Sequence, residues 1–332
     1  MAPRVLVSLL VCAAAARAQE DVFEVAIRDG DADTVEAVFK GKGEAFVDTE
    51  ALGSQGFTPL QMAARYGNTA AAKVLLSLGA KVNRPHVPTR TTALMLAARE
   101  GHVETVDTLL ESLSRVVPCL ALPCLPLSSP ASPGLGARRV RLDVADWRPS
   151  DRYMQNAEEP VIAAYTVDAI DEHGSTALGL AALECEGEIA WKLVQAGADP
   201  THLDEAGNSV LHIGAYYCSE EMRAGPRKGA GAEGAGEGFA RALFSSTDAA
   251  ARDRVVAAVD LMSPMGRSPL HLAAKQNSYG FAMELLARGA DPSVASDVDQ
   301  ETPVELARKW GHDDLLEALR HEVKAHDARG DL

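Results

Sequence analysis

The chain has 332 residues, of which 47% are hydrophobic and only 5% aromatic, so most of its apolar side chains are small. Asp and Glu outnumber Lys and Arg by 47 to 32, which gives a formal net charge of -15 at pH 7. This acidic total argues against general nucleic-acid binding. The composition suits one elongated array and does not require a large globular core.

The first predicted element is a secretory signal peptide at residues 1–18. Arg4 precedes a short apolar stretch, and the small-x-small sequence at 16–18 forms a cleavage site before Gln19. The stretch is too short to span a bilayer, and no later run approaches that length. We therefore expect a secreted or luminal chain with no membrane span after cleavage. The alternative is an apolar tail on a cytoplasmic protein.

A segment of about 13 residues then recurs along the chain. The copies are DVFEVAIRDGDAD from Asp21, FTPLQMAARYGNT from Phe57, TTALMLAAREGHV from Thr91, STALGLAALECEG from Ser175, NSVLHIGAYYCSE from Asn208, GRSPLHLAAKQNS from Gly266 and ETPVELARKWGHD from Glu301. Between the Thr, Ser or Asp positions 21, 58, 92, 176, 209, 268 and 302 the steps are 37, 34, 84, 33, 59 and 34 residues. The sequence therefore predicts seven units with two insertions.

Each unit predicts a helix, a tight turn and a second helix. Thr58-Pro59 places a hydroxyl at an N-cap and a proline in the first turn, where no backbone donor is lost. Gly67 follows nine residues after the cap, which suits a left-handed C-cap. A second apolar stripe comes next. Because one such unit cannot bury its apolar face alone, the units must stack into a solenoid.

The Thr-Pro-Leu start at 58–60, the Ser-Pro-Leu-His start at 268–271, the Gly-His turns and the Gly-Ala-Asp-Pro segments resemble ankyrin repeats, over roughly residues 21–113 and 166–322. The resemblance implies an all-α solenoid of stacked helix pairs with β-hairpin fingers, whose concave groove binds proteins. It also assigns His212 and His271 to a structural slot that braces the turn between repeats. We expect repeats 1–3 at 21–113, repeat 4 and the start of repeat 5 at 166–218, the rest of repeat 5 with repeats 6 and 7 at 238–325, and a C-terminal tail at 326–332.

The two predicted insertions differ in composition. Residues 114–165 begin with a run rich in Pro, Leu and Ser that cannot continue a helix. We expect this segment to be largely disordered, or even translated intron, and the alternative is a loop that extends the binding surface. Residues 219–237 are rich in Gly and Ala and predict a flexible linker between the two helices of repeat 5.

Four cysteines follow the signal peptide. Cys185 and Cys218 occupy the same offset in adjacent repeats, in the slot that Gly fills elsewhere. Stacked helices lie ~8–10 Å apart, whereas a disulfide needs Cα atoms within roughly 7 Å. The spacing therefore predicts that this pair stays unbridged. Cys119 and Cys124 lie close enough in sequence to pair, but nothing requires it.

No catalytic, metal or cofactor site is predicted. GAGAEG at 229–234 lacks the strand and helix of a dinucleotide site, and the histidines of HEVKAH at 321–326 are five residues apart, where a zinc motif needs four. We therefore expect a noncatalytic scaffold without a cofactor. The alternative is an enzyme, or the regulatory subunit of one, whose activity lies in residues 115–165.

The partner-binding residues are predicted from the family's concave face, to which the ends of the first helices contribute. They are Arg65, Tyr66, Arg99, Glu100, Glu184, Tyr216, Tyr217, Lys275, Lys309 and Trp310. Seven residues after the cap, five of seven repeats carry a cation, although cations also favour a helix C-terminus for structural reasons. Tyr, Trp and Arg dominate interface hot spots. We expect a protein partner with an acidic, partly apolar ridge, and no nucleic acid.

Overall fold

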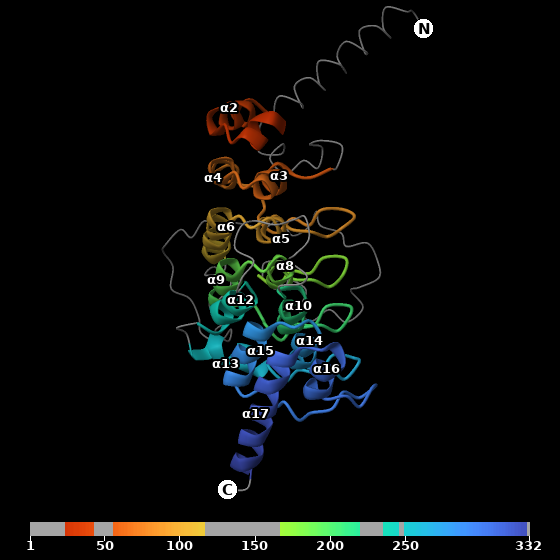
Figure 1. The fold of residues 1–332 in the computed structure, drawn as a ribbon. Coiled ribbons are helices and arrows are strands. Elements are labelled where there is room, and N and C mark those ends of the chain that lie inside the picture. Colours follow the sequence, from red (N-terminus) through yellow and green to blue (C-terminus); the bar gives the residue numbers. More distant parts are fainter. Residues whose placement is uncertain (1–23, 43–55, 117–166, 220–234, 246–248, 331–332) are drawn as a thin grey trace, which may run out of the picture.

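The computed structural model describes residues 24–42, 56–116, 167–219, 235–245 and 249–330, and predictions on other residues lie outside this part. The residues outside it include the predicted signal peptide, most of both predicted insertions, Cys119 and Cys124. In the described part, helices stack in sequence order in two parallel columns, with α2 at one end and α17 at the other (Figure 1). The predicted all-α solenoid is confirmed.

The first helix of each repeat forms one column and the second helix forms the other. The first column comprises residues 24–29, α3 (Pro59–Tyr66), α5 (Ala93–Arg99), α8 (Ala177–Glu184), α10 (Val210–Tyr217), α14 (Pro269–Lys275) and α16 (Pro303–Trp310). The second comprises α2 (Ala32–Lys42), α4 (Thr69–Ser77), α6 (Val103–Val116), α9 (Gly187–Gln195), α12 (Ala235–Phe244), α15 (Tyr279–Ala287) and α17 (Asp313–Gly330). From α3 onward in the first column and from α2 onward in the second, each helix contacts the next one, across both predicted insertions.

Local sequence sets the ends of the first helices. In α3 the Thr58 hydroxyl accepts from the Gln61 N–H at 3.2 Å, and the Gln61 side chain accepts from the Thr58 N–H at 2.9 Å. This reciprocal capping box satisfies two backbone donors that a helix start leaves unpaired. Gly67 ends α3 in the left-handed region at φ 72°, as Gly311 ends α16 at φ 74°. The predicted N-cap at Thr58 and C-cap at Gly67 are therefore confirmed.

Small residues allow the first helices to approach closely. The alanine pairs at 63–64, 97–98, 181–182 and 273–274 are fully buried. In repeat 5 the first member of the pair is Gly214, where a Cβ would lie 2.8 Å from the Phe239 ring and 2.9 Å from the Phe281 ring. Gly214 thus leaves room for two phenylalanines of the second column, which contribute apolar burial to the core.

The fingers are turns on one side of the stack (Figure 1). Each closes with a backbone hydrogen bond, such as His86 N to Thr91 O at 2.9 Å and Ser296 N to Glu301 O at 3.0 Å. The described fingers contain no β-sheet. In place of the expected β-hairpins they form turns that these hydrogen bonds close. Neighbouring fingers are also linked, because Glu205 N donates to His173 O at 3.1 Å.

One helix was not predicted. α13 (Ala249–Ala257) lies between α12 and the next finger and packs on α12. It buries Ala251 and Val255, and Arg254 Nη1 donates to the Gly197 carbonyl at 3.0 Å. At the C-terminus, α17 continues to Gly330, into the segment that the sequence assigned to a tail.

Candidate functional site

The predicted partner-binding residues all lie where first helices end. Each is among the last residues of its helix or is the C-cap that follows, as in Arg65 and Tyr66 of α3 and Glu100 after α5. Equivalent positions of stacked repeats face the same side, so these residues form one continuous strip. We call the strip, with Leu183 of α8 added, the inner-helix face.

Large apolar side chains on this face are exposed to solvent. The exposed fractions are 53% for Trp310, 40% for Tyr66, 39% for Tyr217 and 36% for Leu183. Single exposed apolar residues are ordinary, whereas here four large ones share one face. Leu183 lies seven residues after its cap, as Arg65 does, but it is neither aromatic nor charged and is not among the predicted partner-binding residues.

Several cations of this face already have a counter-ion within the chain. Arg99 Nη2 donates to Glu100 at 3.1 Å, and Lys309 Nζ donates to Glu301 at 2.5 Å. At the equivalent position of the first repeat, outside this face as defined, Arg28 Nε lies 3.3 Å from the Asp29 carboxylate. The positive charge that this face offers a partner is therefore smaller than the row of cations in the sequence suggests.

The other two cations of the row, Arg65 and Lys275, lie against aromatic rings. The Lys275 Nζ atom lies 5.8 Å from the centroid of the Trp310 ring, in the next repeat. The Arg65 guanidinium carbon lies 5.6 Å from the Phe57 ring. Both distances are within the range of cation–π attraction. The rings of Tyr216 and Tyr217 meet edge to face with centroids 4.9 Å apart, a favourable arrangement for an aromatic pair.

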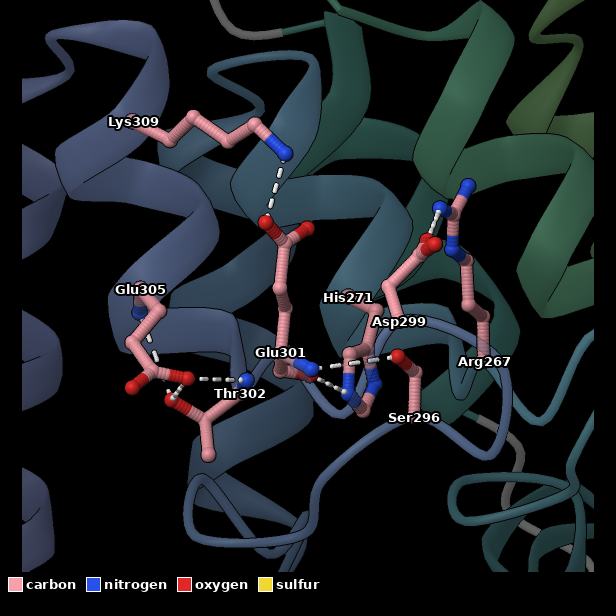
Figure 2. Close-up of polar contacts among 8 residues, drawn as sticks. All are labelled: Arg267, His271, Ser296, Asp299, Glu301, Thr302, Glu305 and Lys309. Atoms are coloured by element: carbon pink, nitrogen blue, oxygen red, sulfur yellow. Dashed lines mark hydrogen bonds and ion pairs between the residues drawn. The ribbon is translucent and has the colours of Figure 1, made fainter.

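The two signature histidines are structural, as the sequence predicts. Figure 2 shows the His271 ring between its own helix start and the next finger, where its Nε2 lies 3.2 Å from the Glu301 carbonyl oxygen. Its Nδ1 accepts from the Ser268 N–H at 3.1 Å. His212 repeats the arrangement, with Nε2 2.9 Å from the Arg267 carbonyl oxygen. Burial lowers the pKa of His271 to about 4 and also lowers the pKa of His212.

Polar residues ten positions after the N-caps join neighbouring first helices by hydrogen bonds. His102 Nε2 donates to Arg65 O at 2.9 Å, His312 Nε2 to Lys275 O at 3.1 Å and Ser278 Oγ to Ala215 O at 2.9 Å. These bonds satisfy carbonyls that the helix ends leave unpaired. The inner-helix face is therefore held in register from repeat to repeat directly beneath its side chains.

The prediction that Cys185 and Cys218 stay unbridged is wrong. The structure joins them in a disulfide, with Cα atoms 5.6 Å apart. The error lay in using the distance between helix axes. Because Cα atoms lie ~2.3 Å from their axis, residues on facing sides of two helices approach much closer than the axes do. The bond connects the ends of α8 and α10, within the inner-helix face.

No other constellation competes with this face in the described part of the chain. There, no three His, Cys, Asp or Glu side chains come together to hold a metal, and no helix is long and apolar enough to span a membrane. The HEVKAH sequence lies on α17, where His321 is exposed. The glycine-rich sequence at 229–234 lies outside the described residues, as does most of the segment 115–165, to which the alternative prediction assigns an activity.

Known proteins share both the sequence pattern and the fold. A family profile for ankyrin repeats in three copies matches residues 23–117, and an ankyrin repeat profile matches residues 265–297. The nuclear factor NF-kappa-B p105 subunit of Gallus gallus is 28% identical over 156 residues, which are 44% of this chain and 16% of that protein. The match thus spans a small part of that relative's length.

Two solved structures are similar over 90% of this chain. The human ASB11 ankyrin repeat domain matches with a TM-score of 0.54 and 17% identity, over 96% of its length. The ankyrin repeat domain of Bcl-3, described as a unique member of the IkappaB protein family, matches with a TM-score of 0.56 and 18% identity, over 97% of its length. The stacked helix pairs define a repeat solenoid, and the chain carries ankyrin repeats at residues 23–117 and 265–297.

Proposed function

We propose that the chain is a noncatalytic scaffold that binds a partner protein through the inner-helix face. The observation that carries this proposal is the exposed row of Tyr66, Leu183, Tyr217 and Trp310 on one side of the stack. The column of first helices packs through small buried residues, so the stack does not need these large side chains. Tyr and Trp are the side chains that interfaces use most as anchors.

The similar proteins support an interaction role without naming the partner. The p105 relative is a subunit by its name, and Bcl-3 belongs to the IkappaB family by its description. Ankyrin arrays bind unrelated proteins through variable surface residues, so the fold alone does not give the partner. We propose a partner with an apolar ridge, and with acidic groups that lie against Arg65 and Lys275.

The experiment compares capture by two immobilised forms of the full chain. One is the wild type, and the other carries Tyr66→Ala, Tyr217→Ala and Trp310→Ala. A partner that uses this face is retained by the wild type and lost from the triple variant. Equal retention on both would contradict the proposal. Tyr279→Ala is the matched control, because Tyr279 is 47% exposed but lies on α15 in the other column.

The competing proposal, an enzyme or regulatory subunit, places activity in residues 115–165. Deletion of this segment distinguishes the two. Loss of a turnover activity would favour the enzyme, whereas retained folding and binding would favour the scaffold.

We further propose that the protein works in the secretory pathway. The N-terminal sequence supports this, and so does the Cys185–Cys218 disulfide, because disulfides persist in oxidising compartments and are rare in the cytosol.

A further inference from the structure

We propose that the Cys185–Cys218 disulfide is a redox-controlled lock on the inner-helix face, and that its reduction frees the ends of α8 and α10 from each other. The consequence for partner binding rests on the proposed function. The structural change does not, and it can be measured without a partner.

The bond lies directly beneath side chains of the inner-helix face. Cys185 follows Glu184, the last residue of α8, and Cys218 follows Tyr217, the last residue of α10. With the two Cα atoms 5.6 Å apart, the bond fixes the spacing between the exposed Leu183 and the exposed Tyr217. A partner that contacts both side chains would therefore meet a pre-organised pair, which lowers the cost of ordering them.

The connection that follows α10 contains more residues than the connections that follow the other first helices. α3 and α4 are separated by two residues, because α3 ends at Tyr66 and α4 begins at Thr69. In repeat 5, α10 ends at Tyr217 and α12 begins at Ala235. The entropic cost of closing a connection between two helices grows with the number of residues in it. The disulfide thus provides a tether at the repeat whose two helices lack a short connection.

The backbone at Cys185 gives a second reason to expect a local change. Cys185 has φ 61°, in the left-handed region, where Gly67 and Gly311 stand in their repeats. This conformation is unfavourable for a residue with a Cβ atom. When the disulfide is intact, the bond to the neighbouring repeat helps to hold it. After reduction that covalent restraint is gone, and the turn can relax.

The reaction needs a dithiol as the reductant. A reductant thiolate attacks Cys185 Sγ, because Cys185 is partly exposed whereas Cys218 is 1% exposed. The sulfur–sulfur bond breaks, and Cys218 leaves as a thiolate that takes up a proton. The second thiol of the reductant then attacks the mixed disulfide and releases Cys185. The products are two protein thiols and the oxidised, cyclic reductant.

The test uses the full chain with Cys12→Ser, Cys119→Ser and Cys124→Ser, which leaves Cys185 and Cys218 as its only cysteines. Hydrogen exchange and hydroxyl-radical labelling are measured by mass spectrometry with and without dithiothreitol. We expect reduction to speed exchange at 183–185 and 216–219 at least ten-fold and to raise the labelling of Tyr217 at least two-fold. Tyr66 and Trp310, in distant repeats, should keep their labelling.

Adding Cys185→Ser and Cys218→Ser supplies the matched control. This variant should show the reduced pattern both with and without dithiothreitol. Three outcomes would each overturn the lock. They are free thiols in the unreduced protein, identical exchange and labelling with and without dithiothreitol, and changes in labelling that spread equally to Tyr66 and Trp310. Reduction could change exchange and labelling as expected while the triple aromatic variant still binds the partner normally. That outcome would contradict the proposed function and leave the redox-controlled lock standing.

Discussion

His271 and Glu301 are joined across the boundary between the sixth and seventh repeats, with His271 Nε2 3.2 Å from the Glu301 carbonyl oxygen. The other ring nitrogen accepts from the Ser268 N–H, so the ring is neutral with its proton on Nε2. Protonation of Nδ1 would place a proton against the Ser268 N–H. The repeat boundary therefore depends on the neutral form of this histidine.

This dependence predicts a loss of stability in acid. The pKa of His271 is lowered from 6.5 to about 4, so the stabilising effect is complete above pH 6.5 and is lost as pH falls towards 4. The loss should amount to about 3 kcal/mol of unfolding free energy. His271→Gln should remove this part of the pH dependence. The measurement is urea unfolding of both proteins at several pH values between 7 and 4.

Gln is the matched replacement because the chain already uses it. In repeat 2, Gln61 fills the same slot, accepting from Thr58 N and donating to the Arg84 carbonyl at 2.9 Å. The variant should therefore stay folded at pH 7. Parallel stability curves for the wild type and the variant across this pH range would contradict the assignment.

For Asp168 we expect a pH dependence of stability opposite in sign to that of His271. Burial raises the pKa of Asp168, and its carboxylate accepts from the Asp199 N–H at 3.0 Å. A raised pKa means that the charged form destabilises the fold once pH exceeds the unfolded value of about 3.8. Asp168→Asn keeps the acceptor oxygen and removes the charge. It should raise the unfolding free energy at pH 7 by roughly 0.5–1 kcal/mol.

Chemical unfolding at pH 7 and well below pH 3.8 tests this expectation. In acid the gain should vanish, since both states of the wild type are then protonated. A gain that persists in acid would point to packing as its cause.

Deletion of residues 115–165 should leave the array folded. It restores a 33-residue step between Thr92 and Thr176, and repeats 3 and 4 already contact each other through both helix columns. Lys192 Nζ also donates to Asp107 at 2.8 Å across this boundary. The thermal midpoint should shift by less than about 4 °C, which corresponds to ~1 kcal/mol. Two separate melting transitions in calorimetry would show that the segment is needed to join the halves.

Export has its own test. Fusion of residues 1–20 to a cytosolic reporter should send the reporter into the secretory pathway, and N-terminal sequencing of the mature chain should begin at Gln19. A reporter that stays uncut in the cytosol would contradict the signal-peptide prediction.

Features with local causes could be predicted from the sequence. The caps at Thr58 and Gly67 depend on residue type at fixed spacing, and the His271 slot follows from the repeat signature. The disulfide was missed because distances between helix ends depend on how repeats pack. The insertion in the 59-residue step before Ser268 was predicted from its Gly and Ala content, but no repeat motif marks the extra helix α13 in the same step. Counter-ions such as Glu301 for Lys309 lie in a finger, so only the folded chain reveals them.

The most direct test of the inner-helix face is a titration of the captured partner against single variants. Tyr217→Ala and Arg65→Ala should each weaken binding by ~1–3 kcal/mol while changing unfolding stability little. Tyr279→Ala should leave the affinity unchanged. Wild-type affinity in both face variants, or unfolding of the array by either, would contradict the face as the binding site and direct attention to the finger tips near His173, Glu205 and Met265.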